Sequence, residues 1–533
     1  MWKKILKIRI KIIVVAVFSI LFFIPKNSKA QSGSARIIEA NLKQTPTPLN
    51  MSFNECIGAG RANEGLRADW QRQLRIVQKE CGFRYIRFHG LLSDDMGVYK
   101  EDKYGNPSYN WQYIDELYDF LLSIHIKPFV ELGFMPKALA SGNQTVFWWK
   151  GNITPPKDYN KWDNLIKALV THWTERYGED EVASWFFEVW NEPNLRGYFF
   201  SGDQNDYFKL YRETAETIKK VSSKYRVGGP ASAGNAWVPA MLKFCGDEHV
   251  PIDFITAHEY GVMIGHVDTS GESGTIINPN KNAVSNNMKK TKEMILNSSL
   301  PHLGLHYTEW SSSYTPTDFM HDTYEQAPFI LNSIKQAGSS VNSMSYWTFT
   351  DIFEELGPRF QAFHGGFGLM NYEDIKKPAY YAFKFMNELG NKEYASTDAD
   401  SYVCKDSSGN VRVLFWDCTI DHANDTTNDQ QFYNRVIPAK PASAAKLKLT
   451  GLKPGKYSME IYRTGFKVND PFTSYMSMGS PAQLTRKQVA ELKQQNSGAP
   501  SEQQIINISA DGKLEKEFTM RQNDVYFVKL NKL

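Results

Sequence analysis

The stretch WFFEVWNEPN (residues 185–194) decides the fold, because an apolar run with strand character ends there in a polar turn, and an amphipathic helical pattern follows over residues 206–223. The same unit recurs from about residue 50 to residue 390. We predict strands at residues 53–58, 85–89, 128–132, 185–190, 227–229, 254–258, 304–309 and 343–349. Helical patterns lie between them at residues 69–81, 111–124, 159–177, 206–223, 284–297 and 322–337.

Eight strand–helix units over roughly 340 residues predict an α/β fold, a (β/α)8 TIM barrel. The alternative is a doubly wound open sheet, which usually carries a glycine-rich phosphate loop after its first strand. The stretch NECIGAG (residues 54–60) resembles such a loop only superficially, since no third glycine follows at the required spacing. The barrel is therefore preferred.

Beyond about residue 395, short alternating runs separated by turn residues predict an antiparallel β-sandwich. One helix is predicted within it at residues 481–495, capped by Ser480, and residues 35–42 are expected to lend the sandwich a further strand. The sandwich strands are predicted at residues 402–404, 411–416, 445–449, 457–462, 504–509 and 525–530. The expected organisation is a signal peptide at 1–30, an N-terminal segment at 31–48, the barrel at 49–392 and the sandwich at 393–533.

The first thirty residues explain the net charge. They hold seven cations and no acids, an apolar run over residues 12–24, and the small residues Ser28 and Ala30 where a signal peptidase reads. Thirteen apolar residues are few for a membrane span, so we expect cleavage, no membrane anchor, and export to the periplasm or the medium. Removing this segment takes the formal charge from +3 to −4, which argues against a nucleic-acid partner.

Five cysteines are scattered through the chain, at positions 56, 81, 245, 404 and 418. Cys404 and Cys418 flank a predicted turn at residues 407–410. Symmetric pairing about that turn sets Cys404 opposite residue 412 or 413 and leaves Cys418 beyond disulfide reach. We interpret all five as buried thiols. No Cys/His spacing matches a zinc site, and we expect neither a metal nor a cofactor.

Two glutamates stand at the ends of predicted strands four and seven: Glu192 in WNEPN (residues 190–194) and Glu309 in HYTEW (residues 306–310). In a barrel, functional residues gather at the carboxyl ends of the strands. Glycoside hydrolysis needs two such carboxyl groups, one with a raised pKa to protonate the leaving oxygen and one that stays ionised to attack the anomeric carbon. A lone glutamate is usually an ordinary surface residue, but two at matching strand ends favour this chemistry.

The motif WNEP (residues 190–193), followed by a glutamate on strand seven, resembles the barrel glycosidases whose acid and nucleophile lie on strands four and seven. Among them the chain resembles glycoside hydrolase family 39, the β-xylosidases and α-L-iduronidases. The supporting stretches are RYIRFHG (84–90), VELGFMP (130–136), GGPA (228–231), AHEY (257–260), FEELG (353–357) and MRQNDV (520–525). The resemblance covers nearly all of the chain after the leader.

The resemblance implies that Glu192 is the general acid/base and Glu309 the nucleophile, with the two carboxyl groups about 5–5.5 Å apart and the anomeric configuration retained. It also implies that Asn191 bonds the sugar 2-hydroxyl. Arg87 is interpreted as a structural or electrostatic support of the site. The other substrate-binding residues that the resemblance implies are His89, Phe134, His258, Tyr260, Trp347, Glu354 and Glu355.

The substrate is expected to be neutral. An iduronidase needs a cation for the sugar carboxylate, and although Arg359 is available, Glu354 and Glu355 beside the catalytic pair would repel a uronic acid. Terminal β-D-xylosyl residues of xylo-oligosaccharides or xylosides are therefore favoured, with α-L-arabinosides, β-glucosides, β-galactosides and α-L-iduronides as alternatives. A carbohydrate-binding protein that keeps the barrel without catalysis and a structural surface protein are the non-enzyme alternatives. Residues 261–282 are expected to reshape the entrance, and a homo-oligomer is left open.

Overall fold

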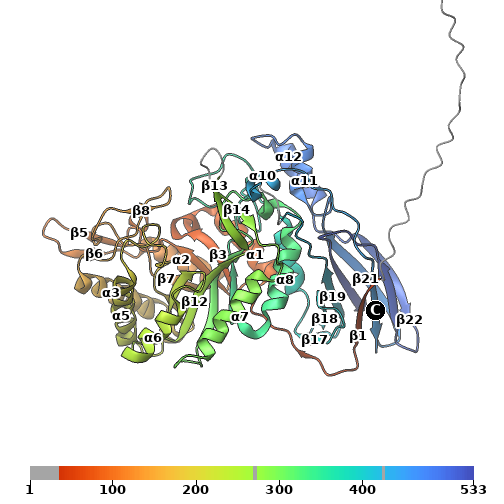
Figure 1. The fold of residues 1–533 in the computed structure, drawn as a ribbon, viewed down its shortest axis with the longest axis horizontal. Helices are drawn as coiled ribbons and strands as arrows, with labels where there is room; N and C mark the ends of the chain where they lie inside the picture. The colour runs from red at the N-terminus through yellow and green to blue at the C-terminus, as the bar shows by residue number, and fades with distance from the viewer. Residues whose placement is uncertain (1–34, 268–272, 423–426) are drawn as a thin grey trace, which may run out of the picture.

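The structure, a computed structural model, describes residues 35–267, 273–422 and 427–533, and Figure 1 shows a barrel joined to a sandwich that carries the C-terminus. The signal peptide predicted at residues 1–30 lies outside the described residues. Within the described part of the chain, no helix combines the length and apolar character that crossing a bilayer requires.

Eight parallel strands close into a barrel, which confirms the predicted fold. Each strand pairs with the next along the chain, and the last pairs with the first. The strands are β3 (Cys56–Arg61), β4 (Tyr85–His89), β7 (Lys127–Glu131), β10 (Phe186–Glu188), β11 (Arg226–Ala233), β12 (Phe254–Tyr260), β15 (Gly304–Ser311) and β16 (Ser343–Tyr346). The larger helices of this part are α1 (Ala68–Cys81), α2 (Gln112–Ser123), α3 (Tyr159–Tyr177), α5 (Gln204–Val221), α6 (Val238–Glu248), α7 (Ala283–Leu296), α8 (Gln326–Ala337) and α9 (Pro378–Asn387).

The barrel interior is closed by aromatic side chains at its amino-terminal end. Tyr85, Phe129 and Phe186, from the adjacent strands β4, β7 and β10, form one buried cluster with Phe254 of β12 and Cys56 of β3. Further along these strands the inward residues include charged side chains, so the apolar cluster lies directly beneath a polar site. Small additions outside the barrel are α4 (Glu179–Ala183) and the hairpins of β5 (Tyr99–Glu101) with β6 (Pro107–Tyr109) and of β8 (Thr145–Val146) with β9 (Gly151–Asn152).

The C-terminal part is a two-sheet sandwich around its own apolar core. The segment before the barrel joins it, because β1 (Arg36–Asn41) pairs in parallel with β20 (Ala445–Thr450). The second partner of β20 is the antiparallel β23 (Leu514–Phe518). The larger sheet has the order β2 (Thr47–Pro48), β17 (Lys392–Tyr394), β18 (Ser401–Lys405), β19 (Val411–Trp416), β24 (Val525–Lys532), β21 (Gly455–Thr464) and β22 (Glu502–Ile508).

The helical insertion differs from its prediction. It contains two helices, α11 (Pro471–Ser477) and α12 (Arg486–Gln495), so the helix predicted from residue 481 begins five residues later. Thr485, not Ser480, is the N-cap of α12, because its hydroxyl accepts from the backbone of Gln488, whose side chain bonds back to the Thr485 backbone. A proline that starts a turn can mimic a helix start in the sequence.

All five thiols are free as predicted, and four are buried while Cys418 is partly exposed; Cys404 pairs in register with Arg412 across the predicted turn. A buried ion cluster stabilises the end of the barrel instead. Lys377 Nζ, fully buried, lies 2.7 Å from Asp322 Oδ1 and 3.0 Å from Asp351 Oδ2. Both carboxylates would be left without a charge partner if the lysine were removed.

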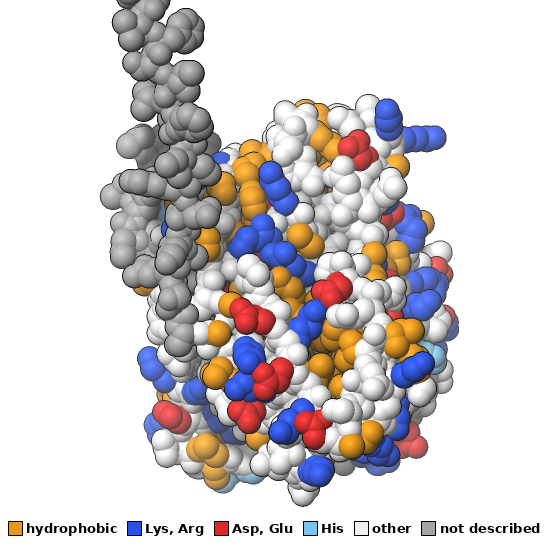
Figure 2. Space-filling view, turned by 90° about the vertical axis from the view of Figure 1, so that its right-hand side faces the viewer, with side chains coloured by type: hydrophobic (Ala, Val, Ile, Leu, Met, Phe, Trp, Pro, Cys, Tyr) orange, Lys and Arg blue, Asp and Glu red, His pale blue; other side chains and the backbone are white. Residues whose placement is uncertain are grey.

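A hairpin of β13 (Val262–Val267) and β14 (Ser273–Ile277) stands above the barrel and is braced from the C-terminal part (Figure 1). Gln430 of α10 (Asp429–Phe432) accepts from the Thr275 backbone N–H at 2.8 Å and donates to the Thr275 hydroxyl at 2.9 Å. On the described side chains of the face shown in Figure 2, basic and acidic groups are mixed with apolar ones, which is typical of a solvated surface.

Candidate active site

The loop after β10 holds the central carboxyl group in a strained backbone. Trp190 and Glu192 have φ angles of 72° and 41°, in the left-handed region that non-glycine residues rarely adopt. Tertiary bonds hold this conformation: the Glu192 N–H donates to Ala231 O at 2.9 Å, and Trp190 Nε1–H donates to Phe199 O at 2.7 Å. Such outliers of φ concentrate at functional sites.

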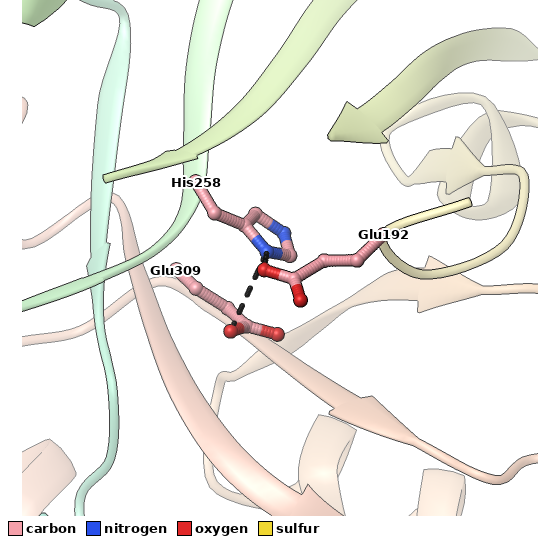
Figure 3. Close-up of side chains that lie close together, drawn as sticks. All are labelled: Glu192, His258 and Glu309. Carbon is pink, nitrogen blue, oxygen red and sulfur yellow. Dashed lines mark hydrogen bonds and ion pairs between the residues drawn. The ribbon is translucent and has the colours of Figure 1, made fainter. Parts of the chain in front are cut away.

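Three side chains converge at the carboxyl ends of the strands. A carboxylate oxygen of Glu192, one of Glu309 and a ring nitrogen of His258 all lie within 4.8 Å of one another. Figure 3 shows them pointing toward a common centre, Glu192 from the loop after β10, His258 from β12 and Glu309 from β15. The expected meeting of the strand-four and strand-seven glutamates is therefore present in the fold.

Glu309 accepts hydrogen bonds on both of its carboxylate oxygens. Arg87 Nη1–H donates to its Oε1, and the Tyr260 hydroxyl donates to its Oε2 at 2.8 Å. Donors on both oxygens and a fixed positive charge stabilise a carboxylate over the acid. Burial raises the pKa of Tyr260 well above its ordinary value, so its hydroxyl keeps the proton that it donates. Glu309 is thus prepared to act as a nucleophile or as an anion.

Arg87 forms ion pairs with several carboxylates beneath the site. Its side chain is fully buried, and it also contacts Glu131 Oε2 at 2.8 Å, Glu188 Oε2 at 2.9 Å and Asn191 Oδ1 at 2.8 Å. Burial would raise the pKa of Glu131, but His89 and Arg87 outweigh it and hold that pKa below its usual range. The bond to Asn191 Oδ1 leaves the amide NH2 of Asn191 to serve as a donor toward a ligand.

His258 connects Glu192 to this network through a chain of hydrogen bonds. The Thr308 hydroxyl donates its single proton to Glu188 Oε1 at 2.7 Å, so it accepts from His258 Nε2–H at 3.1 Å. Burial lowers the pKa of His258 to about 4, so the ring is neutral and its Nδ1 bears a lone pair. That lone pair lies 2.8 Å from Glu192 Oε1, which must then supply the proton of this hydrogen bond.

Glu192 is therefore held as the acid. Burial raises the pKa of Glu192 to about 7, although His89 and Arg87 act to lower it. The two neighbouring carboxyl groups thus differ in their hydrogen-bond partners, since Glu309 accepts from the Arg87 guanidinium and the Tyr260 hydroxyl while Glu192 faces an acceptor. A neutral acid and an ionised carboxylate at this separation suit glycosyl transfer with retention.

A cavity of about 770 Å³ opens over the pair. Its inner wall contains the Trp347 ring and the side chains of His89, Asn191 and Glu355. His89 Nδ1 lies 2.6 Å from Glu131 Oε2, which orients the ring, and its Nε2 lies 3.7 Å from Glu355 Oε1. Burial and the neighbouring carboxylates raise the pKa of Glu355 well above its usual range, so it can donate as well as accept. This volume is that of an ordinary small-molecule site.

Three of the residues expected to touch substrate do not line the cavity: Glu354, Phe134 and His258, the last of which lies beneath it against Glu192. Glu354 turns away and pairs with Arg61 at 2.6 Å and with Arg67 at 2.9 Å. Of this pair only Glu355, in the turn that the Gly357 N–H closes onto Glu354 O, lines the cavity. Phe134 is fully buried behind His89 and Trp190, with ring centroids 5.9 and 5.5 Å away, and supports the wall rather than forming it.

Sequence reasoning missed Glu131, Glu188 and Thr308. Each lies on an apolar barrel strand, and the first two are 0 % exposed at their side chains. The sequence did contain an indication of Glu131 and Glu188: each is a single acid within an otherwise apolar run, on two neighbouring strands. Arg87, on the strand next to that of Glu131, balances their charge. Charges of opposite sign inside buried strands indicate a paired network, because an unpaired buried charge is costly.

The same trio of Glu192, His258 and Glu309 has the spacing of a three-ligand metal site, the one such set found among the described residues. Its donor set disagrees with that use. Arg87 places a permanent positive charge against Glu309, and the His258 lone pair already accepts from Glu192. A divalent cation would have to displace both interactions. The charges therefore suit acid–nucleophile chemistry better than metal binding.

Comparison with known proteins agrees with this geometry. The family model described as "Glycosyl hydrolases family 39" matches residues 36–515. A β-xylosidase of Geobacillus stearothermophilus is 39% identical over 485 residues, which cover 90% of this chain and 92% of the relative. A solved enzyme of this family from Xanthomonas axonopodis pv. citri has a TM-score of 0.91 at 40% identity, covering 96% of this chain and 100% of that one. A monomeric β-xylosidase from Caulobacter crescentus has a TM-score of 0.89 at 40% identity, covering 94% and 100%. The chain belongs to glycosyl hydrolase family 39.

Proposed function

We propose that this family 39 glycosidase is a retaining β-xylosidase that removes terminal β-D-xylosyl residues from xylosides and xylo-oligosaccharides. The observation that carries the proposal is the pair of Glu192 and Glu309, whose carboxylate oxygens lie within 4.8 Å, with the pKa of Glu192 raised by burial and with Glu309 accepting from Arg87 and Tyr260. The Geobacillus relative, which is 39% identical over 90% of this chain, is named as a β-xylosidase, and this supports the same activity.

In the first step Glu309 attacks the anomeric carbon, and Glu192 gives its proton to the glycosidic oxygen as that bond breaks. The alcohol leaves, and the sugar is held as an ester of Glu309. In the second step Glu192, now ionised, takes a proton from water while the water oxygen attacks the anomeric carbon. Glu309 leaves as a carboxylate, Glu192 regains its proton, and the configuration is retained after two inversions.

The inner wall supplies the contacts for the sugar. Trp347 offers a flat apolar face, and Arg87 packs behind it, 5.7 Å from the ring centroid. His89 and Glu355 are assigned to the outer hydroxyls, and Asn191 to the 2-hydroxyl through its free amide NH2. His258 and Tyr260 serve the two carboxyl groups rather than the sugar, by their bonds to Glu192 and Glu309.

A neutral sugar is preferred over a uronic acid. None of the described residues that line the cavity is lysine or arginine, whereas Glu192, Glu309 and Glu355 all face it. A carboxylate on the substrate would be buried among these acidic groups without a compensating cation from the lining residues. The experiment is a panel of aryl glycosides: β-xyloside, β-glucoside, β-galactoside, α-L-arabinoside and α-L-iduronide. We expect the β-xyloside to have the highest kcat/KM, and a higher value for any other sugar would reassign the substrate.

The non-enzyme alternative is tested by the same panel. A carbohydrate-binding protein would bind xylose yet cleave none of the five glycosides. We also propose that residues 1–30 direct export and are removed, because of their seven cations and following apolar run. The compartment is then the periplasm or the medium, and N-terminal sequencing of the enzyme recovered from those fractions tests the cleavage near residue 31.

A further inference from the structure

The outer half of the cavity is apolar, unlike its polar inner half. Five side chains with exposed apolar surface surround it, and they come from three separate segments. They are Leu195 (36% exposed), Tyr198 (72%), Met263 (43%), Ile264 (50%) and Tyr314 (49%). Isolated exposed apolar residues are ordinary, but a contiguous group that rims one cavity indicates a binding surface.

These residues lie where the leaving group must pass. Leu195 and Tyr198 follow Glu192 on the same loop, and Met263 and Ile264 follow Tyr260 at the start of the β13–β14 hairpin. The sugar side of the site is closed by buried residues, so the group attached to the glycosidic oxygen has to project past Glu192 toward this rim. Continuity with the proposed sugar site therefore gives the apolar surface an occupant.

The rim offers few partners for sugar hydroxyls. Thr315 and Glu259 are the polar side chains among the described lining residues of this part, besides the two tyrosine hydroxyls. Glu259 is 9% exposed, and it already accepts a hydrogen bond from Asn287 Nδ2 at 3.0 Å. A second sugar ring bound here would lose the water bound to its hydroxyls and would contact methyl, methylene and thioether groups instead. Those groups form no hydrogen bonds to replace the water, so this desolvation costs free energy.

The hairpin that carries Met263 and Ile264, two of the five rim residues, is held in place by hydrogen bonds of Thr275. The Thr275 hydroxyl contacts Ser313 Oγ at 3.0 Å and Asp318 Oδ2 at 3.2 Å, and Thr275 also holds the two bonds to Gln430 described above. Because these contacts are buried, they fix the hairpin over the barrel from both parts of the chain. Ile276 and Ile277 of β14 are buried, whereas Met263 and Ile264 of β13 stay exposed and line the cavity.

We propose that this rim is an aglycone subsite for apolar alcohols, so that the preferred substrates are β-D-xylosides of alkyl or aryl alcohols rather than xylo-oligosaccharides. The inference rests on the proposed xylosidase activity and specifies its leaving group. The aglycone subsite comprises Leu195, Tyr198, Met263, Ile264 and Tyr314. The alternative occupant, a second xylose, is an outcome of the test.

The test measures kcat/KM for ethyl, butyl, hexyl and octyl β-D-xyloside, below the micellar concentration of the octyl compound, beside xylobiose. These alcohols have nearly the same acidity, so the chemical step is matched and only burial changes. A fully buried methylene contributes about fourfold, and we expect about twofold per half-buried methylene on this rim. Octyl xyloside should then exceed ethyl xyloside by at least tenfold and exceed xylobiose as well. A flat series with xylobiose as the better substrate would overturn the proposal.

Variants locate the effect. The double substitution Leu195→Ser and Ile264→Ser should flatten the dependence of log(kcat/KM) on chain length. The matched control, Ile505→Ser, changes an exposed isoleucine of β22 in the sandwich, and it should leave the slope and the activity unchanged. If the double variant keeps the full slope, the apolar side chains are not the contact and the proposal fails.

Binding separates this inference from the proposed activity. If no xyloside is hydrolysed, the xylosidase assignment fails, but tryptophan fluorescence titration still compares the Kd values of ethyl and octyl xyloside, because Trp347 lies in the cavity wall. A Kd at least tenfold lower for the octyl compound supports the apolar subsite independently of turnover. Equal Kd values would refute it.

Discussion

Replacing Thr308 by valine should shift the pH dependence of catalysis, although Thr308 does not line the cavity. In the native structure the Thr308 hydroxyl bonds Glu188 Oε1 at 2.7 Å and accepts from His258 Nε2 at 3.1 Å. Valine has nearly the same shape but accepts nothing. His258 is then free to carry its proton on Nδ1, where it donates to Glu192 instead of accepting from it.

The magnitude follows from the hydrogen bond that changes direction. A bond donated to a charged group contributes roughly 1.5–3 kcal/mol, which corresponds to lowering the pKa of Glu192 by roughly one to two. The pKa starts at about 7. Because the first step needs the protonated form of Glu192, the alkaline limb of the kcat/KM profile should move to lower pH by the same amount. Stability should fall by about 1–3 kcal/mol, since a buried oxygen of Glu188 loses its donor.

The assay is kcat/KM from pH 4 to pH 9 with an unactivated alkyl xyloside, for which acid assistance is essential. Thr308→Ser is the matched control, because it keeps the hydroxyl and should keep the native alkaline limb. Urea unfolding of each variant separates loss of folded protein from a change in protonation. An unmoved alkaline limb in folded Thr308→Val would refute the proton assignment to Glu192 and His258.

Three further outcomes test the site and the fold. Glu309→Ala should reduce kcat at least a thousandfold for every glycoside, and normal turnover by this variant would remove the nucleophile assignment. Glu192→Ala should lose most activity on alkyl xylosides while retaining part of it on activated aryl xylosides, with azide giving a β-configured product; equal losses on both substrates would refute the acid role. Lys377→Met should lower the free energy of unfolding by about 3–5 kcal/mol at neutral pH, and by less in acid, where its two buried aspartate partners become protonated. Lys376 is partly exposed, so Lys376→Met should lower it by less than about 1 kcal/mol, with urea unfolding as the measurement for both variants.

Much of the fold could be read from local pattern. All eight barrel strands were predicted, and β4 matched its bounds (Tyr85–His89) because apolar β-formers are flanked there by glycine and arginine. Other strands moved by a few residues, since a strand ends where pairing with its neighbour ends and not where apolar residues stop. The start of α12 was misplaced for a similar reason: its cap is defined by the reciprocal bonds of Thr485 and Gln488.

The sequence by itself determined the alternation that makes a barrel and the two glutamates at the ends of strands four and seven, because both depend on spacing along the chain. Only the tertiary structure decided which neighbouring residues face the ligand and where the protons lie. Glu355 lines the cavity, whereas Glu354 pairs with two arginines outside it. Arg87, Glu188 and Thr308 form a hydrogen-bonded layer beneath the site. Side-chain direction and hydrogen-bond polarity arise from contacts between strands far apart in sequence, so they exist only after the barrel has closed.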